Sequence, residues 1–105
     1  MMEIQKISPQ EINEVNAIIE KEFSYLKMPT QKLKDRSNDP NVFIFTARIQ
    51  SELAGFIDLS ITYNIAMLNG FGVKENFRKR GIGKKLLQFG INFLKEIGVE
   101  QVRLL

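Results

Sequence analysis

Apolar residues return every three or four positions near the start of this chain. The residues that follow this spacing are Ile12, Val15, Ile18, Ile19 and Phe23. Such spacing places one apolar stripe along a helix. Ser8 is suited to cap that helix, Pro9 to its first position and Glu11 to completing a capping box. We therefore predict a helix from Ser8 to about Phe23.

Other apolar residues gather in short runs rich in β-branched and aromatic side chains, a composition typical of strands. The predicted strands are Glu3–Ile7, Val42–Ile49, Leu53–Tyr63, Ile65–Val73 and Val99–Leu105. The three middle strands follow one another through short turns, so we expect antiparallel neighbours. The segment Leu26–Pro40 is irregular, with a short helix predicted at Thr30–Arg36.

A second helical stripe begins at Gly81 and ends before Gly98, a residue type that commonly stops helices. Its apolar members, which we assign to the core, are Ile82, Leu86, Phe89, Phe93 and Ile97. The helix separates the last two predicted strands, which makes a βαβ unit with parallel strands and a right-handed crossover. The expected fold class is α+β, of the three-layer α/β type, with a mixed central sheet that is antiparallel first and parallel at its end.

Composition limits the chemistry that the chain can perform. Its 105 residues allow one small domain, and it contains neither cysteine nor histidine. Imidazole bases, Ser-His and Cys-His nucleophile pairs, disulfides and thiolate metal sites are therefore excluded, and we expect no metal. The apolar runs are too short to span a bilayer and the start lacks a signal pattern. A cytoplasmic location without a membrane partner is expected.

The turn before the second helix combines two glycines with a basic cluster. Its five cations are Arg78, Lys79, Arg80, Lys84 and Lys85. A helix start leaves amide N–H groups unpaired and carries partial positive charge. Gly81 and Gly83 remove Cβ atoms that would keep a ligand from those amides. The turn therefore predicts an anion site, with a phosphate as the favoured ligand; nucleic acid is the alternative ligand.

Two common phosphate-binding motifs do not fit this turn. A nucleotide P-loop aligned on Gly83 and Lys84 would need a glycine at Arg78 and a hydroxyl residue at Lys85. A dinucleotide-binding fingerprint would need a third glycine where Leu86 stands. Neither of these two motifs therefore accounts for the turn.

The spacing that does fit is Arg78-x-x-Gly81-x-Gly83, with Phe77 before it and Val73 ending the preceding strand. This resembles the signature of the GCN5-related N-acetyltransferase (GNAT) superfamily, and the resemblance in element order covers essentially the whole chain. It implies the GNAT-like acyl-CoA N-acyltransferase fold. It also implies transfer of an acetyl group from acetyl-coenzyme A to an acceptor amine by direct attack.

The resemblance also assigns cofactor-binding residues. The backbone amides of the signature loop would hold the pyrophosphate; its residues are Arg78, Lys79, Arg80, Gly81, Ile82, Gly83 and Lys84. Phe71 and Val73 would hydrogen-bond the pantetheine arm through their backbone, as a further strand would. Gly70 and Gly72 flank Phe71, and glycines inside a strand often mark a bulge or a close approach by a ligand.

The sequence assigns no catalytic residue and offers three candidates. The family uses a carboxylate or an ordered water to deprotonate the acceptor amine, and the strand Ile65–Val73 contains no carboxylate. Glu22 and Asp58 are candidates, each with a surface charge as the alternative reading. Asn69 is the polar side chain of that strand and completes the candidate list.

By the same resemblance, residues 1–105 are the cofactor-binding portion of a single GNAT-like domain that is C-terminally truncated. The acceptor is expected to be a small-molecule or peptide amine. A second copy of the chain or a partner chain is expected to cover the edge of the last strand, because a bare apolar edge invites aggregation. The alternative function is a non-catalytic small basic domain that binds acyl-coenzyme A or nucleic acid.

Overall fold

The computed structural model describes residues 2–22 and 30–104, which fold into a five-stranded sheet with helices. Its elements are β1 (Met2–Lys6), α1 (Ile12–Glu22), α2 (Thr30–Ser37), β2 (Val42–Ile49), β3 (Glu52–Thr62), β4 (Ile65–Val73), α3 (Ile82–Glu96) and β5 (Gln101–Leu104). Short 3-10 turns at Pro9–Glu11 and Glu75–Phe77 precede α1 and α3. No helix in these described ranges is long and apolar enough to cross a membrane.

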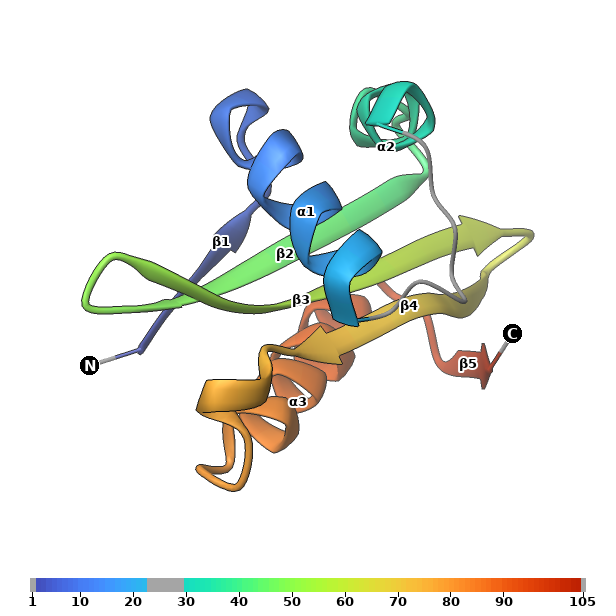
Figure 1. Ribbon diagram of the computed structural model, residues 1–105. Helices are drawn as coiled ribbons and strands as arrows, with labels where there is room; N and C mark the ends of the chain where they lie inside the picture. Colours follow the sequence, from blue (N-terminus) through green and yellow to red (C-terminus); the bar gives the residue numbers. More distant parts are fainter. Residues whose placement is uncertain (1, 23–29, 105) are drawn as a thin grey trace.

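The strands lie in the order β1-β2-β3-β4-β5. The first three pairings are antiparallel, and β5 pairs with β4 in parallel. The mixed sheet and the closing βαβ unit are therefore confirmed. Figure 1 shows α1 and α2 on one face of the sheet and α3 on the other, which gives the predicted three layers.

Each face of the sheet has its own apolar core. The core beneath α1 and α2 contains Ile19 and Leu33, packed on Ile44 of β2. The opposite core contains Leu86 and Leu94 of α3. Alternate residues of a strand point to opposite faces, so β2 and β3 contribute to both cores. This explains why their sequences are almost continuously apolar.

The start of α1 is held by a buried carboxylate. Glu11 Oε1 accepts the Ser8 N–H at 3.0 Å, as a capping box requires. Glu11 Oε2 accepts the Thr46 hydroxyl at 2.9 Å and Arg48 Nε at 2.8 Å from β2. Burial raises the pKa of Glu11, but hydrogen bonds from Ser8, Arg48, Thr46 and Gln5 outweigh it and leave the pKa below its ordinary value. The cap is thus also a bond between helix and sheet.

The end of α3 differs from the predicted stripe. The helix closes with Val99 N–H on the Leu94 carbonyl at 2.8 Å and Gly98 N–H on the Lys95 carbonyl at 3.1 Å. This is the Schellman pattern, with Gly98 at φ 87°. Ile97 is the C-cap and is 46% exposed, so its assignment to the core was wrong. The backbone leaves its helical path there and carries Ile97 off the apolar face.

Candidate active site

Only the first part of β4 has neighbours on both sides. β5 residues Gln101–Leu104 pair with Ile65–Leu68. From Asn69 to Val73, within the described part of the chain, β4 pairs with β3 alone. Its other edge therefore offers backbone groups over that stretch.

The register shows which groups these are. Val73 lies opposite Gly55, and Lys74 N–H donates to the Ala54 carbonyl at 2.7 Å. This pattern defines a non-hydrogen-bonded pair, in which the N–H and C=O of Val73 point away from β3. Because strand backbones alternate, Phe71 presents its two groups to the same edge. The sheet thus directs the backbone of Phe71 and Val73 toward its open edge.

A β-bulge marks the point where the open edge begins. The register of β3 and β4 shifts between Asp58 and Leu59, so that Asn69 is the extra residue on β4. Its side-chain Nδ2 donates to Ser60 Oγ at 2.8 Å and to the Met67 carbonyl at 3.3 Å. A bulge increases local twist and bends the strand. The amide of Asn69 stabilises this bend from within the sheet.

The loop after β4 turns several amide groups toward one side. Lys79 has φ 65° and Gly81 has φ 77°, with a residue of ordinary φ between them. Such alternation of backbone hand forms an anion-binding concavity. Gly81 is the N-cap of α3, and among the described residues no side chain caps the helix, whose first backbone bond joins Lys85 N–H to the Gly81 carbonyl. The N–H groups of Ile82, Gly83 and Lys84 therefore have no acceptor within the helix.

The two glycines of the turn are needed for different reasons. A Cβ added to Gly81 would meet no atom within 4 Å, but the positive φ disfavours any other residue. At Gly83 an added Cβ would lie 3.3 Å from Phe71 Cζ and 3.5 Å from Val73 Cγ2. Gly83 thus lets the start of α3 approach β4 closely. The space that we expected to serve the ligand is filled at Gly83 by the strand.

The basic side chains of the turn separate into two groups. Arg78 Nε donates to the Val73 carbonyl at 2.9 Å, and Arg80 stacks on the Phe77 ring at 5.3 Å from its centroid. Lys79, Lys84 and Lys85 are exposed on the surface. The two arginines hold the loop, whereas the three lysines supply its positive potential.

Glu22 lies at the end of α1 and contacts the loop. Its Oε1 accepts the Glu75 N–H at 2.7 Å and Arg78 Nη2 at 3.3 Å. The side chain is only 12% exposed. The structure thus brings this catalytic candidate to the signature loop and engages its carboxylate there.

Asp58 is buried in an ion pair. Arg36 of α2 donates to its two carboxylate oxygens, from Nε at 3.0 Å and from Nη2 at 2.6 Å. The side chain of Asp58 is 3% exposed and that of Arg36 is 22% exposed. A bidentate pair of this kind is strong and directional. It joins α2 to β3 beside the bulge, and nothing in the sequence pairs these two residues, which are 22 positions apart.

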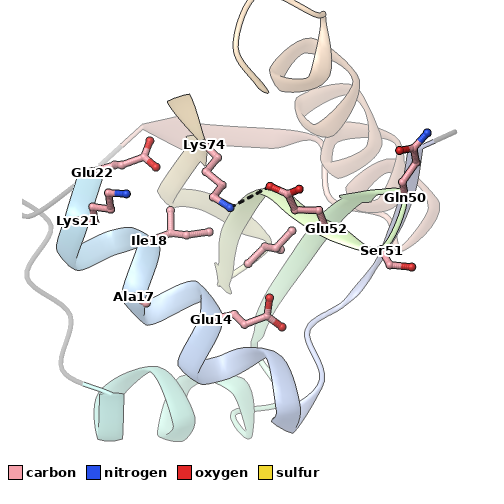
Figure 2. A pocket seen from close by; sticks show the side chains of 10 residues that line it. Glu14, Ala17, Ile18, Lys21, Glu22, Gln50, Ser51, Glu52 and Lys74 are labelled. Carbon is pink, nitrogen blue, oxygen red and sulfur yellow. Dashed lines mark hydrogen bonds and ion pairs between the residues drawn. The ribbon is translucent and has the colours of Figure 1, made fainter. Parts of the chain in front are cut away.

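An open groove of about 550 Å³ lies between α1 and the turn that joins β2 to β3. Figure 2 shows Ala17, Ile18 and Glu22 of α1 on one side of it. Lys74 and Glu52 lie on the other side, and their charged groups are 3.2 Å apart. The groove therefore reaches the end of β4 from the face opposite α3. No cluster of three or more acidic residues that could hold a metal occurs within residues 2–22 and 30–104.

Comparison with known protein families identifies the class. The family model described as "Acetyltransferase (GNAT) family" matches residues 11–105 of the sequence. The chain therefore belongs to the GNAT family of acetyltransferases, enzymes that use acetyl-coenzyme A as acyl donor. No curated protein sequence matches the chain significantly.

Solved structures share the fold at low sequence identity. The PaiA N-acetyltransferase of Thermoplasma acidophilum, solved in complex with coenzyme A, has a TM-score of 0.91 and 22% identity over 99% of this chain and 78% of its own. The ribosomal-protein-S18-alanine N-acetyltransferase of Escherichia coli has a TM-score of 0.89 and 17% identity over 99% of this chain and 66% of its own. A predicted acetyltransferase of Clostridium acetobutylicum, solved with acetyl-CoA, has a TM-score of 0.79 and 14% identity over the whole chain and 80% of its own. The predicted GNAT fold is thus confirmed.

Proposed function

We propose that this chain binds acetyl-coenzyme A along β4 and the start of α3, and that the acetyl group passes to an acceptor amine by direct attack. The observation that carries the proposal is that the open strand edge and the turn before α3 form one continuous surface of backbone groups. The open backbone edge at Phe71 and Val73 leads into the turn whose amides, at Ile82 to Lys84, lack helical acceptors. An elongated ligand with amides at one end and phosphates at the other matches both parts.

The residues have distinct roles in this proposal. Phe71 N–H and C=O and Val73 N–H would pair with the pantetheine amides as an added strand does. The Val73 carbonyl is excluded from this set because Arg78 Nε occupies it at 2.9 Å.

The signature loop would hold the pyrophosphate. Its backbone amides serve this role from Lys79 through Arg80, Gly81, Ile82 and Gly83 to Lys84, whereas the Arg78 N–H already donates to the Glu75 carbonyl at 3.2 Å. A helix start offers both N–H donors and a favourable dipole for such a group. The exposed ammonium groups of Lys79 and Lys84 would lie near the phosphates. Lys85 is exposed in the next position of α3 and adds to the same potential.

Direct attack is supported by the residues that the chain contains. Residues 1–105 contain no cysteine and no histidine, so this portion of the domain offers no residue for an acyl-cysteine intermediate or an imidazole base. When bound, acetyl-coenzyme A supplies the thioester as an activated acyl group. Asp58, Glu22 and Asn69 each engage protein groups, and we propose that the acceptor amine loses its proton to water. Catalysis then rests on positioning, through the preorganised amides and strand edge.

The acceptor is proposed as an amine of a small molecule or of a peptide. The similar structures include a ribosomal-protein-S18-alanine N-acetyltransferase and an aminoglycoside acetyltransferase, so that one fold serves both kinds of acceptor. We further propose that residues 1–105 are the cofactor-binding portion of one GNAT domain, because they cover 78% and 66% of two similar chains.

The test is ligand binding followed by turnover. Coenzyme A titrated into the chain should raise its melting temperature and give a saturable heat signal in calorimetry. Acetyl transfer to a panel of polyamines, aminoglycosides and short peptides is then followed by release of the coenzyme thiol. Because the chain contains no cysteine, the coenzyme supplies all of the thiol signal. Absence of stabilisation at millimolar coenzyme A would contradict the proposal, and stabilisation by an oligonucleotide alone would favour the nucleic-acid alternative.

A further inference from the structure

The carboxylate of Glu22 accepts hydrogen bonds from the first residue of the 3-10 turn Glu75–Phe77 and from the residue just after it. This turn leads into the signature loop. The carboxylate accepts the Glu75 N–H, which opens the turn, at 2.7 Å. It also accepts Arg78 Nη2, just after the turn, at 3.3 Å. One nearly buried carboxylate of α1 therefore holds a segment that is more than 50 positions away in the sequence.

The contact continues from Glu22 into β4. The same Arg78 guanidinium donates from Nε to the Val73 carbonyl at 2.9 Å, and Arg78 N–H donates to the Glu75 carbonyl at 3.2 Å. The end of α1, the end of the open strand edge and the start of the loop are thus joined through one side chain. Arg78 is therefore contacted from two directions, by Glu22 of α1 and by the Val73 carbonyl of β4.

The negative charge of Glu22 lies beside the proposed phosphate site. A carboxylate next to a site for phosphates repels the ligand. Here the Arg78 guanidinium neutralises Glu22, and the Glu75 amide that Glu22 engages is withdrawn from the ligand. A residue that bound phosphate directly would not be acidic, and one that served only to solvate the surface would not be 12% exposed. The geometry is that of a group that fixes the loop.

We propose that Glu22 is a positioning residue that presets the pyrophosphate loop by holding Arg78 against the end of β4. The inference rests on the proposed function, since it assigns a role within the same cofactor site. A loop held in its binding conformation binds more tightly, because the cost of ordering has already been met in the free protein. Loss of Glu22 should therefore weaken cofactor binding even in fully folded protein.

The experiment compares Glu22→Ala and Glu22→Gln with Glu20→Gln and the unchanged chain. Glu20 is the matched control, since it is an exposed carboxylate on the same helix and accepts Asn16 Nδ2 at 3.3 Å. The dissociation constant for coenzyme A is measured by calorimetry well below each melting temperature, so that only folded protein is compared. We expect a rise of about tenfold for Glu22→Ala, which corresponds to roughly 1.4 kcal/mol.

The glutamine variant separates the two contacts of Glu22 and keeps the shape of the side chain. Its Oε1 can still accept the Glu75 N–H, but the charge that holds Arg78 is gone, so a smaller rise is expected. A merely structural role would lower the melting temperature and leave the dissociation constant of folded protein unchanged. If both variants bind coenzyme A within twofold of the unchanged chain, the positioning role is overturned. If the unchanged chain binds no coenzyme A, the proposed function itself fails, and the inference fails with it.

Discussion

The ring of Phe71 packs against Gly83, so closely that a side chain at Gly83 would be in tight contact with it. A Cβ built there lies 3.3 Å from Phe71 Cζ. The second glycine of the signature thus serves the contact between α3 and β4. The ring and the glycine together set how near the helix start comes to the strand edge.

We therefore predict that an overpacking cost of about 1 kcal/mol cancels the roughly 0.5–1 kcal/mol that Gly83→Ala would otherwise add to the stability of the helix. Phe71→Leu should relieve the contact in the double variant, so that the two effects are not additive. Chemical denaturation of the two single variants and the double variant measures this coupling. Additive free energies of unfolding would show that the ring does not limit the site.

Gly81 and Gly98 form a natural pair for testing the turn. Both have positive φ, at 77° and 87°, and neither would meet an atom within 4 Å if a Cβ were added. Gly81→Ala and Gly98→Ala should each cost about 1–2 kcal/mol of stability through backbone strain. Only Gly81→Ala should also abolish stabilisation by coenzyme A, because only Gly81 lies in the loop. An equal loss in both variants would assign the effect to strain alone.

Asp58→Asn should lower the stability of the protein and leave most of its acetyl-transfer activity, because Asp58 forms an ion pair and, as we propose, is not the catalytic base. The change leaves the Arg36 guanidinium without its charged partner, at a cost of roughly 3 kcal/mol. Acetyl transfer per folded molecule should fall by less than about tenfold. The measurement is the turnover rate at low temperature divided by the folded fraction of the variant. A thousandfold loss of turnover in fully folded protein would instead make Asp58 the catalytic base.

Stability should fall in acid partly through Glu11. Its folded-state pKa lies below the ordinary value of 4.5, so the unfolded chain takes up the proton first as the pH falls. The contribution of Glu11 is complete well above pH 4.5 and is lost as the pH falls through the depressed folded-state value. Glu11→Gln should therefore destabilise at pH 7 by about 1–3 kcal/mol. Urea unfolding from pH 7 to pH 3 should show the gap to the unchanged chain narrowing in acid; a constant gap would contradict this assignment.

Local pattern was sufficient for most of the elements. Val42–Ile49 and Ile65–Val73 were predicted with the bounds that the structure has, because β-branched runs and turn residues act over a few positions. Ser8 and Glu11 formed their capping box for the same reason. Phe23 lies outside the described residues, so the predicted end of the first helix is met only as far as Glu22.

The cofactor class was also readable from the chain, since the spacing of Arg78, Gly81 and Gly83 is a local property of one strand-to-helix turn. The open edge at Phe71 and Val73 required the register of β3 and β4, because the hydrogen-bonding side of a strand is set by its partner. The partners of Asp58 and Glu22 depended on tertiary structure most of all. A lone carboxylate looks the same in the sequence whether it faces water, acts as a catalytic base or pairs with an arginine. Only packing of α2 on the sheet and of α1 against the signature loop decided which guanidinium each one meets.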